Sequence, residues 1–220
     1  MVKKLAILCV SVAFIAVLFL AAGTASWWNA WVFIGYMILL GAATQRLIKN
    51  SPGLEEERRT AAAGTKKWDI QLVGLINMAL PVMLLVSACD TRFHWLPSVP
   101  VFVSVLAFIL IIPSAYLTYR AMAANLFFSS HVRIQKERGH VVVDAGPYGI
   151  IRHPGYAGSI VFNLLTPLAL GSWSAFVFGI GTAALLTYRT VKEDRVLVAE
   201  LPGYCDYSQK VRYLLVPGMF

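Results

Sequence analysis

The stretch YAGSIVFNLLTPLALGSWSAFVFGIGTAALLTY, residues 156–188, decides how this chain folds. It is strongly apolar, and it is longer than the roughly 20 residues that a helix needs to cross a bilayer. Residues 171–174 (GSWS) interrupt it near its middle with small and polar side chains. We therefore predict a helical hairpin over 156–170 and 174–188. Such a hairpin returns the chain to the side from which it started, so the polar segments before and after it share one side.

Four further apolar runs, 5–23, 28–48, 70–89 and 99–119, are each long enough to span a membrane. Only 14% of the residues are charged, against about a quarter in soluble proteins. The first run follows two lysines, as in a signal peptide, but its apolar core is longer than usual, so we expect a retained helix. The sequence predicts an all-α, polytopic integral membrane bundle of five to six membrane helices. Residues 1–119 supply N-terminal membrane helices, and residues 120–220 form the catalytic region.

The basic residues cluster on one side of this predicted bundle. Segments 1–4, 46–69, 120–155 and 189–220 hold 18 of the 19 Lys and Arg residues, and Arg92 is the exception. Because this bias marks cytoplasmic segments, we expect the N-terminus and the functional site on the cytoplasmic side. We therefore attribute the net charge of +8 to membrane topology, and we expect no nucleic-acid partner. The three scattered cysteines lack metal-site spacing, so we predict no metal, and the oligomeric state stays open.

A polar insert, residues 125–158, precedes the hairpin and contains the stretch GPYGIIRHPGYAG (146–158). Pro154 disfavours helix at the residue before it, so a new helix is expected to begin after that point. Irregular backbone at membrane depth is tolerated where it is buried in protein or lines a cavity. We therefore predict that the insert lines a pocket at the mouth of the bundle. The alternative is a stiff connector, with Arg152 at the membrane interface.

A second polar cluster, residues 188–220, follows the hairpin. Arg189 and Glu193 are four residues apart and share one helix face, and Glu200 lies on the same face. A solvated helix is the alternative interpretation. Arg189, however, directly continues a membrane span, where an ionisable group is a functional-site hypothesis by default.

Two other polar segments are expected to be solvated. In residues 50–69, Pro52 favours the start of a short helix of mixed charge. Asp90 and His94 are interpreted as solvated loop groups rather than ligands.

Together the two polar clusters resemble the isoprenylcysteine carboxyl methyltransferase family. The block H-x-x-V-x-x-G-x-Y-x-x-x-R-H-P-x-Y-x-G is matched by His140, Val143, Gly146, Tyr148, Arg152, His153, Pro154, Tyr156 and Gly158. After the hairpin, the family's R-x-x-x-E-E/D pattern is matched by Arg189, Glu193 and Asp194, and its tail by Gly203, Tyr207 and Pro217. The resemblance covers about residues 120–220, and the ordered set with a hairpin between its parts is specific.

The resemblance implies S-adenosyl-L-methionine as methyl donor and S-adenosyl-L-homocysteine as product. By position, the cofactor-binding residues are Gln135, His140, Val141, Val142, Val143, Tyr148, His153, Pro154, Gly155, Tyr156 and Glu193. Arg189 falls where the family places a substrate-contacting arginine, and we assign it the catalytic role. Asp194 occupies the position at which most members of the family have the second glutamate of an E-E pair.

The residue types agree with methyl transfer to a carboxylate. A carboxylate is already a nucleophile at neutral pH, so positioning rather than a general base is required. Arg189 can hold one carboxylate oxygen while the other attacks. A lipidic or prenylated acceptor is expected to enter between helices from the bilayer, and the soluble cofactor from the cytoplasm.

Three alternatives stay open. A phospholipid N-methyltransferase uses the same cofactor but needs a base for its amine acceptor, and His153 or Glu193 is the candidate. A sterol-type membrane reductase that uses NADPH has a similar C-terminal helix and tail, although the R-H-P-x-Y-x-G block fits it less well. A membrane scaffold without enzymatic activity leaves both polar clusters unexplained.

Overall fold

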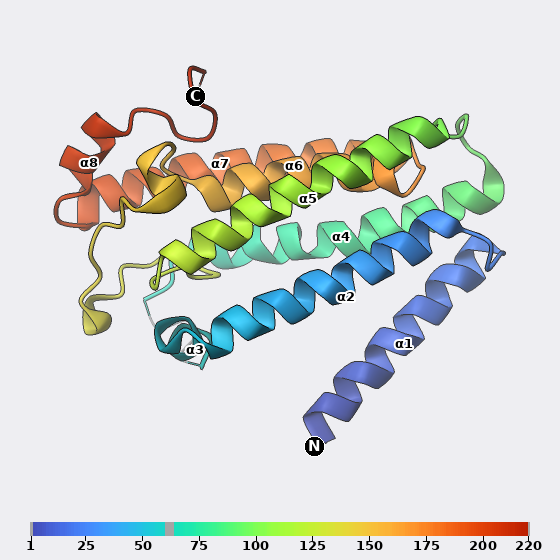
Figure 1. Cartoon of the computed structure of the whole chain (residues 1–220), viewed down its shortest axis with the longest axis horizontal. Coiled ribbons are helices and arrows are strands. Elements are labelled where there is room, and N and C mark those ends of the chain that lie inside the picture. The colour runs from blue at the N-terminus through green and yellow to red at the C-terminus, as the bar shows by residue number, and fades with distance from the viewer. Residues whose placement is uncertain (1, 60–63, 220) are drawn as a thin grey trace.

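The computed structural model describes residues 2–59 and 64–219 (Figure 1). Its helices are α1 (Val2–Ala22), α2 (Trp28–Lys49), α3 (Pro52–Arg59), α4 (Lys67–Phe93), α5 (Val101–Ala124), α6 (Pro154–Ala169), α7 (Phe176–Glu200) and α8 (Tyr204–Lys210). Two short 3-10 helices, η1 (Lys136–Arg138) and η2 (Gly146–Gly149), lie in the polar insert. No strand occurs within the described ranges, so the all-α prediction is confirmed.

Three helices, α2, α4 and α5, are long and apolar enough to cross a membrane. The predicted runs 28–48 and 70–89 lie within α2 and α4, and the run 99–119 lies within α5 except for its first two residues. The predicted run 5–23 falls in α1 except for its last residue. Large apolar side chains such as Leu39 and Phe102 are exposed on the outer surface, as expected of residues that face lipid rather than water. The chain is therefore an integral membrane protein.

The predicted hairpin is formed by α6 and α7, which pack on each other, and its turn occupies residues 170–175. Two glycines allow the helices to approach closely. A Cβ on Gly158 of α6 would collide with the Ser114 carbonyl of α5, and one on Gly179 of α7 would collide with the Asn163 carbonyl of α6. Small residues at helix contacts are typical of membrane bundles, because packing there replaces the hydrophobic driving force.

The polar parts of the chain gather at one end of the bundle, as Figure 1 shows. This end, which we call the polar end, carries α3, α8 and the insert. The opposite end, which we call the far end, carries the connections 23–27, 94–100 and 170–175. Of the predicted charged loop 50–69, residues 60–63 lie outside the described residues. The hairpin therefore places both polar clusters at the same end, as predicted.

Two groups that the sequence analysis treats as solvated are in fact buried. Asp90 lies inside α4 and is 7% exposed, and Glu57 of α3 is 4% exposed. Both predictions are wrong because each acid packs against residues more than 70 positions away, Asp90 against Ser172 and Glu57 against Arg133. His94, which ends α4 in a left-handed conformation, is exposed as predicted.

Candidate active site

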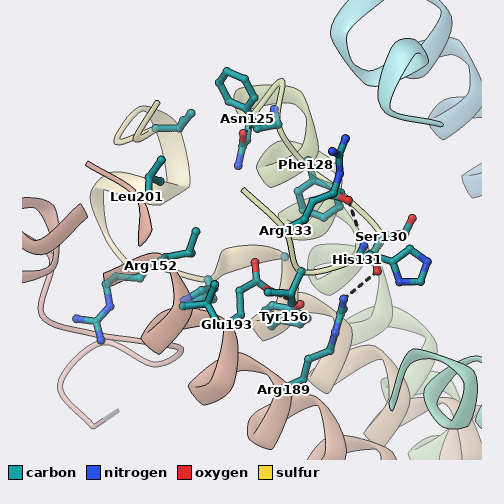
Figure 2. Close-up of a pocket in the computed structure, with 18 of the residues that line it drawn as sticks. Asn125, Phe128, Ser130, His131, Arg133, Arg152, Tyr156, Arg189, Glu193 and Leu201 are labelled. Atoms are coloured by element: carbon teal, nitrogen blue, oxygen red, sulfur yellow. Dashed lines mark hydrogen bonds between the residues drawn. The ribbon is translucent and has the colours of Figure 1, made fainter. Parts of the chain in front are cut away.

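A cavity of about 550 Å³ lies at the polar end, where the insert meets the membrane helices (Figure 2). Its volume is within the range of small-molecule sites. Residues of α4, α5, α6 and α7 line it from the membrane side, and residues of the insert and α8 line it from the other. One cavity therefore joins an apolar interior to a polar surface.

Most of the predicted site residues line this cavity. They are His140, Val141, Val142, Val143, Tyr148, His153, Gly155, Tyr156, Arg189 and Glu193. Two others do not. Gln135 is fully buried, its Nε2 donates to the Phe127 carbonyl at 2.8 Å, and its Oε1 accepts from Arg138. Pro154 begins α6 with its ring buried.

The two polar clusters are joined by adjacent carboxylates of α7. Glu193 Oε2 accepts a hydrogen bond from the Tyr156 hydroxyl at 2.5 Å. Asp194 Oδ1 accepts from Arg152 Nε at 3.0 Å and from the Tyr204 hydroxyl at 2.8 Å. His153 Nε2 lies 3.1 Å from the same oxygen. Glu193 thus faces the cavity, while Asp194 ties the insert to α7 and α8.

Arg152 fixes the C-terminal tail over the insert. Its Nη1 donates to the carbonyls of Ser208, Val211 and Arg212, which follow or end α8. The backbone N–H groups of Arg152 and His153 donate to the Tyr213 and Leu214 carbonyls at 2.9 and 3.0 Å. The insert is therefore more than a stiff connector, because its backbone and its arginine hold the tail in place.

Arg189 is held by an acid, Asp69, whose role the sequence does not predict. Its Nε lies 2.7 Å from Asp69 Oδ1, and its Nη2 lies 3.1 Å from Oδ2 and 2.8 Å from the Ser130 carbonyl. Asp69, in the first turn of α4, is fully buried and also accepts from the Val132 N–H. The signal for it was an acid at the start of an apolar span. One edge of the guanidinium is thus occupied, while Nη1 has no hydrogen-bond partner within the part of the chain that the structure describes.

The wall of the cavity is braced from α3. Glu57 Oε2 lies 2.5 Å from Arg133 Nη2, and Glu57 Oε1 accepts from the Ser129 hydroxyl at 2.5 Å. Arg133 also contacts Glu137, whose side chain is 57% exposed. Arg133 and Ser129 both line the cavity. A short helix that looks solvated in sequence therefore positions part of the site.

Glu57→Gln is expected to lower the free energy of unfolding by about 3 kcal/mol, because it breaks a buried ion pair. In a chain of this size that corresponds to roughly 6–12 °C in Tm. Glu137→Gln removes the exposed partner of the same arginine and is the matched control, for which we expect no measurable change. Thermal unfolding of both variants in detergent measures the difference, and equal Tm values would show that α3 does not brace the wall.

His140 is a neutral hydrogen-bonding group of the cavity wall. Burial, helped by the nearby Arg138 and Arg133, lowers its pKa from 6.5 to about 4. The Gln135 N–H donates to its Nδ1 at 3.3 Å, so the ring proton resides on Nε2. Its ring stacks on Phe127, with 4.5 Å between the ring centroids. His140 therefore offers a ligand a donor without a charge.

The depressed pKa of His140 predicts a loss of stability in mild acid. Between pH 6.5 and about pH 4 the unfolded chain protonates this imidazole and the folded chain does not. The free energy of unfolding is therefore not reduced by this group above pH 6.5, and it falls as the pH drops from 6.5 toward 4. The Tm difference between pH 7 and pH 5 should shrink in His140→Gln. An unchanged difference would place the acid sensitivity elsewhere.

Comparison with known proteins places this region in context. Residues 105–199 match the model of the isoprenylcysteine carboxyl methyltransferase (ICMT) family. Over 99 residues the chain is 31% identical to a protein-S-isoprenylcysteine O-methyltransferase of Schizosaccharomyces pombe, which covers 44% of this chain and 42% of that protein. Over 92 residues it is 28% identical to protein-S-isoprenylcysteine O-methyltransferase B of Arabidopsis thaliana, covering 41% and 47%. The matched segments thus span less than half the length of each relative.

Proposed function

Because residues 105–199 belong to the isoprenylcysteine carboxyl methyltransferase family, we propose that the protein is an integral membrane methyltransferase that uses S-adenosylmethionine. Its acceptor is the carboxylate of a lipidic or prenylcysteine-like molecule, and the second product is S-adenosylhomocysteine. One observation carries the proposal. A single cavity is lined by the insert and α8 on one side and by membrane helices on the other, as a water-soluble donor and a lipidic acceptor require.

The polar part of the cavity fits the methyl donor. Tyr148 offers an aromatic ring to a sulfonium or an adenine ring, and Tyr156 lines the same cavity with the Arg189 guanidinium already 5.3 Å from its ring centroid. Glu193 offers a carboxylate to ribose hydroxyls or an amino group, and neutral His140 offers a donor. The donor supplies an electrophilic methyl group when bound. All four side chains come from the insert, α6 and α7, within the family match.

The membrane part of the cavity fits an apolar acceptor chain. Val73 and Ile76 of α4 line it, together with Leu186 of α7. Leu186 lies one turn of α7 before Arg189, so an apolar tail among these residues brings its polar head toward the guanidinium. A lipidic acceptor would therefore reach the site from the bilayer.

The chemistry needs orientation rather than a base. The acceptor oxygen forms a bond to the methyl carbon while the sulfur–carbon bond breaks and its electron pair stays on sulfur. A carboxylate brings its own charge to this step. We propose that Asp69 holds Arg189 by one edge, so that Nη1 holds the acceptor's second oxygen. The bias of Lys and Arg toward this end of the bundle supports a cytoplasmic position for it. We propose that residues 120–220 form the catalytic region there.

A phospholipid N-methyltransferase is the second candidate, and one observation favours it. His131 lines the cavity, and its Nδ1 lies 3.5 Å from Asp69 Oδ2. A histidine beside a buried carboxylate can remove the proton that an amine acceptor must lose. His153 and Glu193, the bases that the sequence suggests, are instead engaged by Asp194 and Tyr156.

Transfer of a tritiated methyl group from S-adenosylmethionine distinguishes these activities. The purified protein in lipid nanodiscs is offered N-acetyl-S-farnesylcysteine, its methyl ester, or phosphatidylethanolamine. We expect labelling of the free acid alone, with volatile tritiated methanol released by alkali, because an ester forms. Alkali-stable labelling of phosphatidylethanolamine would favour the second candidate, and no transfer to any lipidic acceptor would overturn the proposal.

A further inference from the structure

A second cavity lies among the elements at the far end of the bundle, and it is separate from the candidate active site. It has a volume of about 220 Å³ and lies among the start of α2, the end of α4, the start of α5 and the α6–α7 turn. Its polar lining comprises Asn29, Asp90, Thr91, His94, Ser98 and Ser104. None of the residues that line it also lines the first cavity.

Asp90 is a buried acid of this cavity with one oxygen unpartnered. It is 7% exposed, and its Oδ2 accepts from the Ser172 hydroxyl at 2.7 Å. Its Oδ1 is buried and has no hydrogen-bond partner in the described part of the chain. The other two acids that are at least nine-tenths buried differ, since Asp69 is paired with Arg189 and Glu57 with Arg133. No basic side chain pairs with Asp90 among the residues described here.

An unpaired carboxylate is costly in such a place. Burying a charge away from water requires a counter-charge and hydrogen bonds, and a buried polar atom without a partner often marks a missing water or ion. The hydroxyls of Ser87 and Ser174 are also buried without a partner. Ser87 lies one turn before Asp90 in α4, and Ser174 lies in the same turn as Ser172. Unsatisfied polar groups therefore lie on both elements that the Asp90–Ser172 contact joins, α4 and the α6–α7 turn, although Ser87 and Ser174 do not line the cavity themselves.

The remaining lining selects the kind of cation. Trp27 and Trp28 line the cavity and offer aromatic surface, which attracts ammonium groups. Asn29 donates from Nδ2 to the Ala169 carbonyl at 2.6 Å, which leaves its Oδ1 as an acceptor. Arg92 lies near this end but is not a lining residue and donates instead to the Leu20 carbonyl, so His94 is the one basic side chain of the described lining. The cavity thus has acceptors and aromatic faces for a cation but no arginine for an anion.

We propose that the far-end cavity binds an ammonium group, with Asp90 as its counter-ion. The ammonium belongs either to the headgroup of an aminophospholipid or to a small soluble amine. The volume suits a headgroup rather than a whole lipid, and tryptophans such as Trp28 are typical of the membrane–water interface where headgroups lie. This site is separate from methyl transfer and does not depend on the proposed function.

Thermal unfolding of the purified chain tests the site without reference to activity. The protein is placed in detergent micelles doped with phosphatidylethanolamine or with its N-acetylated form, which lacks the positive charge of the ammonium group but keeps the phosphate. We expect phosphatidylethanolamine to raise Tm by about 5 °C, as a ligand well above its Kd does, and the N-acetylated lipid to have no effect. Free ethanolamine at millimolar concentration identifies the source, since an equal rise indicates a soluble amine and no rise indicates the lipid headgroup.

Variants of the chain locate the effect. Asp90→Asn should lose the rise in Tm, and Asp206→Asn, which changes an exposed acid of α8, should keep it. An equal rise with the N-acetylated lipid, or a full rise in Asp90→Asn, would overturn the proposal. If Asp90→Asn fails to fold, Trp28→Ala, which removes an exposed aromatic side chain of the same cavity, takes its place, and a full rise in that variant would count against the proposal.

Discussion

Glu193→Ala is expected to weaken the binding of S-adenosylhomocysteine by about 100-fold. Glu193 is a carboxylate of the cavity wall that already accepts a hydrogen bond from Tyr156. Its loss removes a charge-assisted contact, worth about 1.5–3 kcal/mol, and leaves the Tyr156 hydroxyl without its acceptor. Isothermal titration of the purified variant with S-adenosylhomocysteine measures the change.

Glu200→Ala is the matched control for this variant. Glu200 lies on the same helix, but it is exposed and pairs with Lys66 at the surface, with 2.6 Å between Nζ and Oε1. Surface ion pairs contribute little to stability, and Glu200 does not line the cavity. The affinity of Glu200→Ala for S-adenosylhomocysteine should therefore stay within about twofold of that of the unaltered chain. Equal affinities for Glu193→Ala and Glu200→Ala would remove Glu193 from the cofactor site.

Arg189→Ala is expected to keep S-adenosylhomocysteine binding and to lower turnover by about 100- to 1000-fold, the cost of removing one oriented donor. It also leaves Asp69 buried without its partner, which costs about 3–5 kcal/mol of stability. The single variant therefore mixes a catalytic effect with a structural one, and turnover must be read beside Tm.

A double variant separates the two effects. Asp69→Leu combined with Arg189→Met replaces the buried ion pair by apolar side chains, an exchange that is often neutral for stability. We expect this double variant to recover part of the Tm that Arg189→Ala loses, since the Val132 N–H still loses its acceptor, while methyl transfer stays as slow as in the single variant. Methyl transfer at the original rate in the double variant would show that Arg189 serves the fold alone.

The apolar runs and the break at residues 171–174 are local signals, and for that reason they predict the membrane helices and the hairpin. The meeting of the two polar clusters follows from the hairpin, because α6 and α7 must return to the same end. The placement of Tyr148 and Tyr156 on the cavity wall follows from the resemblance together with this geometry.

Partners far apart in sequence are the part that the sequence does not reveal. Asp69 and Arg189 are 120 positions apart, and Glu57 and Arg133 are 76 apart. Each acid looks solvated when only its neighbours are read, and its burial depends on which helix packs beside it. Asp90 is hidden for the same reason, since its contact with Ser172 joins α4 to the α6–α7 turn. Gln135 does not line the cavity, because the irregular backbone of the insert turns its side chain toward the Phe127 carbonyl.

Binding of S-adenosylhomocysteine and of NADPH to the purified full chain tests the central claim most directly. A sterol-type reductase, which would bind NADPH, has a C-terminal helix and tail similar to α7 and the segment after it. Equilibrium dialysis in nanodiscs should show saturable binding of S-adenosylhomocysteine at one site per chain and no saturable binding of NADPH. Tight binding of NADPH without any binding of S-adenosylhomocysteine would contradict a methyltransferase site in this cavity.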